Sequence, residues 1–168
     1  MRLTSGTTTL RRLQPADLSI FQAYRQDPDI ARYQDWEAMS DARATGFLTH
    51  MARITPLMRL GQWAQVAVTH TETDVLIGDM GLYLSEDGTE AEVGITLGAA
   101  QHGQGHATRA VRLASQFLFD ETEIAHIRAY ADVRNTPSRA LMKRAGFTQT
   151  GTSTTAGVKE AVFLLNRP

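Results

Sequence analysis

The sequence predicts one α/β domain, with a mixed and mostly antiparallel sheet of about six to seven strands flanked by about four helices. Apolar residues recur at helical spacing in some segments, and they alternate with polar residues in others. The two kinds of segment are interleaved, because helical patterns stand both before and between the alternating ones. The 168 residues suffice for one hydrophobic core of ordinary size, so we expect a single domain over residues 1–168.

The first half of the chain predicts a β-prone segment, two helices and then three strands. Residues 7–13 are β-prone, and Pro15 and Asp17 follow them in the order that suits the first turn of a helix. Ser40 is placed to cap a second helix, which ends before Pro56. Short polar connections between the three strands predict an antiparallel meander. These strands are expected at residues 62–70, 75–84 and 90–97.

The second half of the chain predicts two more helices and three more strands. One helix follows the glycine-rich run at residues 101–105. Thr136 and Pro137 have the pattern of a cap and a first helical position, and Gly146 suits the position just past the end of that helix. The strands are expected at residues 127–133, 147–152 and 158–165.

The composition excludes several classes of function. A formal net charge of −1 gives no general attraction to nucleic acid or to an anionic membrane, so we expect neither partner. The sequence has no cysteine, which excludes disulfides, thiolate metal sites and a cysteine nucleophile. No apolar run approaches the roughly 18 residues that span a bilayer, and the first residues lack an apolar signal core. We therefore expect a cytoplasmic protein.

Charge is distributed unevenly along the chain. Between Arg59 and Arg109 there is neither lysine nor arginine, and the remaining residues carry all 17 basic side chains against 11 acidic ones. Such an acidic section favours a cationic substrate on one side of the molecule, although solvated hairpin turns would give the same pattern. The section holds seven acidic residues, namely Glu72, Asp74, Asp79, Glu86, Asp87, Glu90 and Glu92.

The run Gln101-His102-Gly103-Gln104-Gly105 forms a glycine-rich turn between a predicted strand and a predicted helix. Free backbone N–H groups and the helix dipole make such a helix N-terminus a site for an anion. Gly103 and Gly105 allow the backbone to approach a phosphate closely. The run lacks the lysine of a Walker loop, and it comes too late in the chain for the usual dinucleotide fingerprint. A purely structural turn remains the alternative.

The order of several motifs resembles that of the GNAT superfamily of N-acetyltransferases, over nearly the whole chain. The acetyl-CoA-binding motif of that superfamily is similar to Gly94-Ile95-Thr96-Leu97 followed by His102-Gly103-Gln104-Gly105-His106-Ala107-Thr108-Arg109-Ala110-Val111. The next motif is similar to Asn135-Thr136-Pro137-Ser138 followed by Lys143-Arg144-Ala145-Gly146-Phe147. The opening resembles the ribosomal-protein N-terminal acetyltransferases of the RimJ/RimL type, through Leu10-Arg11-Arg12-Leu13, Asp27-Pro28-Asp29-Ile30-Ala31-Arg32-Tyr33 and Trp36.

The resemblance implies a GNAT-like fold with a bulge at Gly94 in the fourth strand, and acetyl-CoA as co-substrate. It places the pyrophosphate on backbone N–H groups from Gln104 to Arg109 and the pantetheine along the fourth strand. Asn135 either bonds the pantetheine or simply caps a helix. The implied cofactor-binding residues are Ile95, Thr96, Leu97, His102, Gly103, Gln104, Gly105, His106, Ala107, Thr108, Arg109, Asn135 and Ser138.

Transfer of an acetyl group to an amine needs a base, because a primary amine is mostly protonated at pH 7. The resemblance points to Glu92 as this base, and otherwise Glu92 is an exposed strand residue. It also points to Ser138 as a proton donor near the sulfur. Many superfamily members carry a tyrosine acid at the position of Met142, and methionine cannot donate a proton.

The acceptor site is expected from three residues. The resemblance places Tyr33 and Trp36 on one wall of this site, with core packing as the alternative, and Asp79 is expected to orient the ammonium group. No metal is expected, because Gly103 and Gly105 between His102 and His106 prevent a shared helical face. Arg134, Arg139, Lys143 and Arg144 form a basic cluster suited to the ribose phosphate of coenzyme A, or they are ordinary solvated charges.

The preferred hypothesis is an N-acetyltransferase that transfers the acetyl group directly to a primary amine, since no cysteine can carry it. The acceptor is a protein N-terminus or a small cationic amine. One alternative is a catalytically silent acyl-CoA-binding module that regulates, which the residue Met142 keeps open. Another is a protein that binds ATP or NAD with the same loop. A homodimer is compatible with all three hypotheses.

Overall fold

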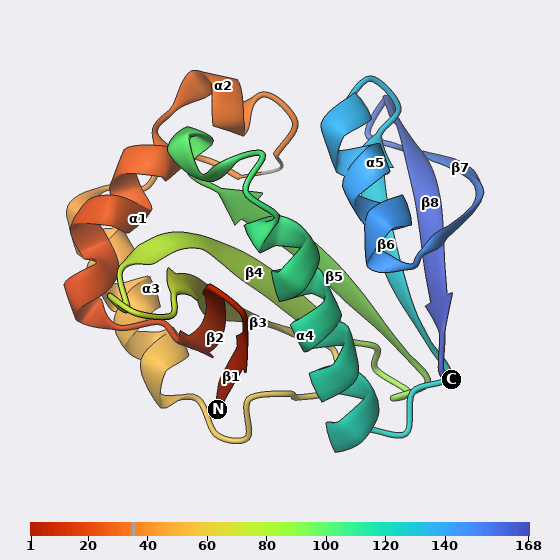
Figure 1. Ribbon diagram of the computed structural model, residues 1–168, viewed down its shortest axis with the longest axis horizontal. Coiled ribbons are helices and arrows are strands. Elements are labelled where there is room, and N and C mark those ends of the chain that lie inside the picture. The colour runs from red at the N-terminus through yellow and green to blue at the C-terminus, as the bar shows by residue number, and fades with distance from the viewer. Residues whose placement is uncertain (35) are drawn as a thin grey trace.

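Within residues 1–34 and 36–168, which a computed structural model describes, eight strands form one sheet in the order β1-β2-β3-β4-β5-β6-β8-β7 (Figure 1). The strands are β1 (Arg2–Ser5), β2 (Thr8–Arg12), β3 (Gln62–His70), β4 (Leu76–Leu84), β5 (Glu90–Leu97), β6 (His126–Asp132), β7 (Thr148–Thr155) and β8 (Val158–Asn166). The helices are α1 (Leu18–Arg25), α2 (Pro28–Ala31), α3 (Asp41–Arg53), α4 (His106–Glu121) and α5 (Thr136–Ala145). Among these helices, none is long and apolar enough to cross a membrane.

The parallel pair of strands, β5 and β6, opens the sheet near its middle. The two strands pair from Glu90 to Glu92 and diverge beyond that point, whereas the other neighbouring strands are antiparallel (Figure 1). We expected a bulge at Gly94 to produce this opening. Instead, β4 and β5 keep a continuous register through Gly81 and Gly94, so the opening comes from strand divergence and not from a register shift.

Side-chain alternation gives the two faces of the sheet different characters. One face carries buried apolar residues such as Val66, Met80 and Val93, and α4 packs against this side of the sheet (Figure 1). The opposite face carries Asp79, and α1 and α3 pack there over β4 and β3. The region of that face beyond α1 and α3 is therefore open to a ligand, as Trp63 on β3 illustrates with 47% of its surface exposed.

Most predicted elements are confirmed, and the count of strands is corrected. The three strands of the expected meander are β3, β4 and β5, and the Ser40 side chain caps α3 by accepting a bond from the N–H of Arg43. The sheet has eight strands within the described residues, because β1 forms a hairpin with β2 around Gly6, whose φ is 54°. Asp27 caps the one-turn helix α2, since its side chain accepts a bond from the N–H of Asp29.

Candidate functional site

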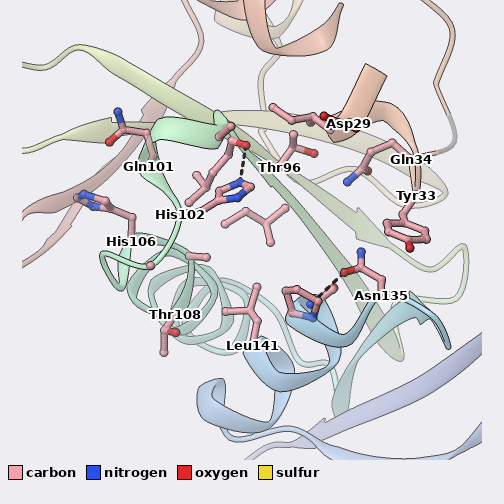
Figure 2. A pocket seen from close by; sticks show the side chains of 18 of the residues that line it. Asp29, Tyr33, Gln34, Thr96, Gln101, His102, His106, Thr108, Asn135 and Leu141 are labelled. Carbon is pink, nitrogen blue, oxygen red and sulfur yellow. Dashed lines mark hydrogen bonds between the residues drawn. The ribbon is translucent and has the colours of Figure 1, made fainter. Parts of the chain in front are cut away.

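A cavity of about 850 Å³ lies at the opening between β5 and β6. Its walls come from the end of β5, the loop that follows it, the first turn of α4, the start of α5 and the segment around α2 (Figure 2). Elements from both faces of the sheet therefore border one space. This volume is in the range of small-molecule sites.

The N-terminus of α4 forms one end of the cavity. Gly105 precedes the helix in the left-handed conformation, with φ at 78°, and Gly103 has a similar φ of 75°. The first backbone bond of the helix joins the N–H of Arg109 to the carbonyl of Gly105 at 3.2 Å. The N–H groups of residues 106–108 come before this bond, so they lack an acceptor within the helix. These residues line the cavity, and their N–H groups can bind an anion.

Two side chains of the loop bond to the backbone of the protein itself. His102 donates from Nε2 to the carbonyl of Leu97 at 3.0 Å (Figure 2), and Gln104 donates from Nε2 to the carbonyl of Ala100 at 2.8 Å. These bonds fix the shape of the loop. A contact from this loop to a phosphate would therefore use backbone N–H groups, as expected, and not these side chains.

The side chain of His106 is buried beneath the loop. Its Nδ1 lies 2.8 Å from the hydroxyl of Thr8, and its ring packs edge-on against His70 with 4.7 Å between centroids. Burial, followed by the charges of His70 and Arg109, lowers the pKa of His106 below its usual value. The imidazole is therefore neutral at pH 7 and supports the first turn of α4. Only the backbone of His106 remains for an anion.

Arg109 is a correction to the expected cofactor loop. Its backbone N–H is bonded within the helix, and its guanidinium donates to Thr8 at 2.9 Å, to Thr7 at 3.0 Å and to the carbonyl of Gln104 at 2.9 Å. Arg109 thus fastens α4 to the β1–β2 hairpin and does not face the cavity. We did not select Thr7 and Thr8 from the sequence, because about 100 residues separate them from Arg109 and no local pattern marks the contact.

The expected pantetheine strand borders the cavity. Ile95, Thr96 and Leu97 line it, and they lie beyond the last residue of β5 that pairs with β6, Glu92. Strand divergence therefore frees one edge of β5 for hydrogen bonds to a ligand. The carbonyl of Leu97 is already bonded to His102, which leaves Ile95 and Thr96 as the better candidates.

The start of α5 forms the opposite wall. Asn135, and not Thr136, caps this helix, since the Asn135 Oδ1 accepts a bond from the N–H of Ser138 at 3.2 Å (Figure 2). Asn135 and Ser138 both line the cavity. Met142, at the position of the usual tyrosine, is buried with 2% of its surface exposed, so its side chain belongs to the core.

Glu92 lies where β5 and β6 part, on the face of the sheet opposite Val93. Burial raises the pKa of Glu92 to about 7, and the negative charges of Glu160 and Glu90 add to this effect against the opposing charge of Arg128. A carboxylate with this pKa is suited to accept a proton near neutral pH. Glu92 is the last residue of β5 that pairs with β6. It therefore lies at the edge of the opening and does not line the cavity.

Asp79, expected to orient the acceptor ammonium, lies in a network of hydrogen bonds with α1 and β3. Its carboxylate is buried and accepts bonds from Tyr24, from Arg25 at 2.7 Å and from Gln65. Burial and the Asp79 charge raise the pKa of Tyr24 well above its usual value. The carboxylate is therefore fully engaged in fixing α1 to β4. These bonds favour a structural role for Asp79, and its expected role at the acceptor ammonium stays a prediction.

The two aromatic residues expected at the acceptor wall separate in the structure. Tyr33 lines the cavity. The distance from its ring centroid to the guanidinium carbon of Arg134 is 5.8 Å. Trp36 instead contacts Arg25, whose guanidinium carbon lies 4.1 Å from the centroid of the Trp36 ring, and it does not line the cavity. Of the expected basic cluster, Arg134 and Arg144 line the cavity, and Arg139 donates to the carbonyl of Val133.

Comparison with known proteins identifies the family. The model of the acetyltransferase (GNAT) domain matches residues 7–148 of the chain. The chain belongs to the GNAT acetyltransferase family. Because this is a family of acetyltransferases, the chain is an acyltransferase. A curated relative, described as the uncharacterized N-acetyltransferase p20 of Bacillus licheniformis, is 28% identical over 144 residues, which are 85% of this chain and 80% of the relative.

Solved structures share the fold at low identity. A GNAT acetyltransferase from Bacillus anthracis has a TM-score of 0.84 at 16% identity, over 99% of this chain and 98% of the other. A ribosomal-protein-serine acetyltransferase, so described for Vibrio cholerae, has a TM-score of 0.78 at 20% identity, over 99% and 98%. The aminoglycoside acetyltransferase AAC(6')-Ib in complex with coenzyme A has a TM-score of 0.76 at 20% identity, over 96% and 95%.

Proposed function

We propose that this GNAT family member is an acetyl-CoA-dependent N-acetyltransferase that moves an acetyl group directly to a primary amine. The observation that carries the proposal is the cavity that joins the free N–H groups of α4 to the unpaired edge of β5. The fold neighbour AAC(6')-Ib was solved with coenzyme A, which supports the same co-substrate here.

The residues present fit coenzyme A. The backbone N–H groups of residues 106–108 would hold the pyrophosphate, and the edge of β5 at Ile95 and Thr96 would bond the pantetheine amides. Asn135 has its Nδ2 group left for the same purpose, because its Oδ1 caps α5. When bound, acetyl-CoA supplies an activated acetyl thioester.

Two side chains would handle protons. Glu92 takes a proton from the acceptor ammonium, directly or through water, because a neutral amine is needed for attack. Ser138 lines the cavity and donates a proton towards the leaving sulfur. A thiol is fairly acidic, so a hydroxyl can suffice where Met142 replaces the usual tyrosine.

The acceptor is proposed as a protein N-terminus or a small cationic amine. The RimJ/RimL-like opening motifs and the Vibrio cholerae fold neighbour favour the protein N-terminus. The acidic section from Glu72 to Glu92 favours any acceptor that arrives as an ammonium ion.

The test is release of free thiol from acetyl-CoA in the presence of a panel of amines and of peptides with free N-termini. We expect release that depends on the amine and falls in the Glu92→Gln variant. Binding of acetyl-CoA without release for any acceptor would instead favour the silent acyl-CoA-binding module.

A further inference from the structure

An aromatic pair stands on the open face of the sheet, outside the cavity. Trp63 on β3 and Tyr83 on β4 are direct cross-strand partners, and their ring centroids lie 5.3 Å apart at 37°. Trp63 leaves 47% of its surface exposed, which is unusual for so large an apolar side chain. Tyr83 in turn pairs with Glu92 on β5, so Trp63, Tyr83 and Glu92 form one row on one face.

The neighbouring row is bare because it contains two glycines. Gly81 and Gly94 are cross-strand partners in β4 and β5. The ring of Trp63 covers Gly81, since a Cβ added there would meet the ring at 2.9 Å. Among the described residues, no atom lies within 4 Å of a Cβ added at Gly94. Open space therefore lies over Gly94, and the Trp63 ring covers its cross-strand partner Gly81.

A carboxyl group lies beside this open space. Glu92 lies two residues from Gly94 on the same face, and the charges of Glu160 and Glu90 act on it. Glu90 is paired with Arg128 at 2.7 Å and with His126 at 2.8 Å, which balances its charge locally. The Glu92 carboxylate, once deprotonated, is complementary to an ammonium ion.

We propose that Trp63 and Tyr83 are specificity residues, which bind a flat apolar group carried beside the primary amine of the acceptor over Gly94. This inference rests on the proposed acetyltransferase function and selects the small cationic amine from the two proposed acceptors, as an arylalkylamine. Strands lie about 4.8 Å apart, so the row from Trp63 to Glu92 spans roughly 10 Å, within reach of a ring joined to an amine by a short arm. The aryl ring stacks on the aromatic pair, and the ammonium points to Glu92.

The experiment compares phenethylamine, cyclohexylethylamine and n-propylamine as acceptors for the wild type, Trp63→Ala, Trp63→Phe and a control, Val75→Ala. Val75 is equally exposed, at 47%, and it directly precedes β4, at the end of this strand opposite to Tyr83. Binding of phenethylamine to the protein with coenzyme A is measured in parallel by saturation-transfer NMR. Circular dichroism checks that each variant is folded.

We expect Trp63→Ala to lower the preference for phenethylamine over n-propylamine, as a ratio of kcat/KM, by at least tenfold, or about 1.4 kcal/mol. The loss should be smaller for cyclohexylethylamine, Trp63→Phe should restore most of the preference, and Val75→Ala should keep it. Equal kcat/KM losses for all three amines in folded Trp63→Ala, or no loss, would overturn the inference.

The parallel binding measurement separates this inference from the proposed function. If no amine is acetylated but Trp63→Ala abolishes the binding of phenethylamine, the aromatic site stands and the acetyltransferase proposal fails. If n-propylamine is acetylated and the variants bind phenethylamine like the wild type, the acetyltransferase proposal stands and the aromatic site is refuted. A protein that neither binds nor acetylates phenethylamine refutes the aromatic site.

Discussion

Two carboxylates on the same face of the sheet, Glu92 and Asp79, differ because of their neighbours. Asp79 is surrounded by the donors Tyr24, Arg25 and Gln65, whereas the strongest influences on Glu92 are burial and the negative charges of Glu160 and Glu90. The donors around Asp79 occupy its carboxylate with hydrogen bonds. Burial and negative charge around Glu92 raise its pKa to about 7, which suits proton transfer. This contrast assigns a structural role to Asp79 and leaves Glu92 as the candidate base.

Glu92→Gln should reduce turnover by about 10²–10⁴-fold, because the amide keeps the shape and cannot accept the proton. In the wild type, activity should rise with pH through about 7 as Glu92 loses its proton, and the variant should lack this limb. Steady-state rates over a pH series measure both effects, with acetyl-CoA affinity as the control. If Glu92→Gln kept wild-type turnover, the base would instead be a water chain or another group.

The raised pKa of Glu92 also affects stability. Its pKa is about 7 in the fold against 4.5 as the ordinary value, so the folded state binds the proton more tightly than the unfolded state. The stabilising contribution is complete below pH 4.5 and is lost as pH rises through about 7. We expect Glu92→Gln to be more stable than the wild type at pH 8 and not at pH 4, as urea unfolding measures. Equal pH dependence of the two proteins would contradict the burial of Glu92.

Asp79→Asn should be strongly destabilising, because it leaves Arg25 buried without its counter-ion. Removal of one partner from a buried pair costs about 3–5 kcal/mol. The matched control is Asp29→Asn, whose pair with Arg32 is exposed and contributes below about 1 kcal/mol. Urea unfolding of both variants checks the difference. A small effect at Asp79 would return this carboxylate to the list of candidates for acceptor binding.

At the scale of elements, the site depends on how α4 and α5 begin. The first turn of α4 is fixed by His106 and Arg109, which bond to Thr8 on the distant β2 strand. The first turn of α5 is fixed locally by Asn135. Sequence patterns located both helices, and the family resemblance assigned Arg109 to the ligand. The contacts of Arg109 with the hairpin have no local signature in the sequence.

Asn135→Ala separates capping from coenzyme binding. Loss of an N-cap costs about 1 kcal/mol, so this variant and the matched cap variant Ser40→Ala should lose similar stability. If the Nδ2 group of Asn135 also bonds coenzyme A, only Asn135→Ala should weaken acetyl-CoA binding, by several-fold, in calorimetry. Asn135→Ser should keep the cap without restoring affinity. Equal affinities in all three variants would limit Asn135 to capping.

At the scale of the whole molecule, the sequence predicted the α/β class, the meander and the position of the loop before α4. These depend on local periodicity and turn residues, which the sequence displays directly. The exceptions depend on contacts between distant segments. The burial of Asp79 against α1, the packing of Trp36 on Arg25 and the divergence of β5 from β6 become visible only when the segments are placed in space.

The acidic section gives a further prediction at this scale. The carboxylates of the acidic section that carry no counter-ion should attract a cationic acceptor, and salt screens this attraction over about 10 Å at 0.1 M. The KM of the acceptor should therefore rise with ionic strength while kcat changes little. Steady-state kinetics from low to high salt measures KM and kcat. The control replaces the salt with an uncharged additive, which leaves the ionic strength unchanged. A KM that is insensitive to salt would refute electrostatic attraction.

Binding of acetyl-CoA at the N-terminus of α4 is tested most directly by calorimetric titration of the wild type and Gly105→Pro. Proline fixes φ near −65°, which conflicts with the 78° of Gly105, and it removes one N–H group beside the cavity. We predict that the wild type binds acetyl-CoA and that the folded variant binds it at least tenfold more weakly. Unchanged affinity in folded Gly105→Pro would contradict the assignment of the co-substrate to this site.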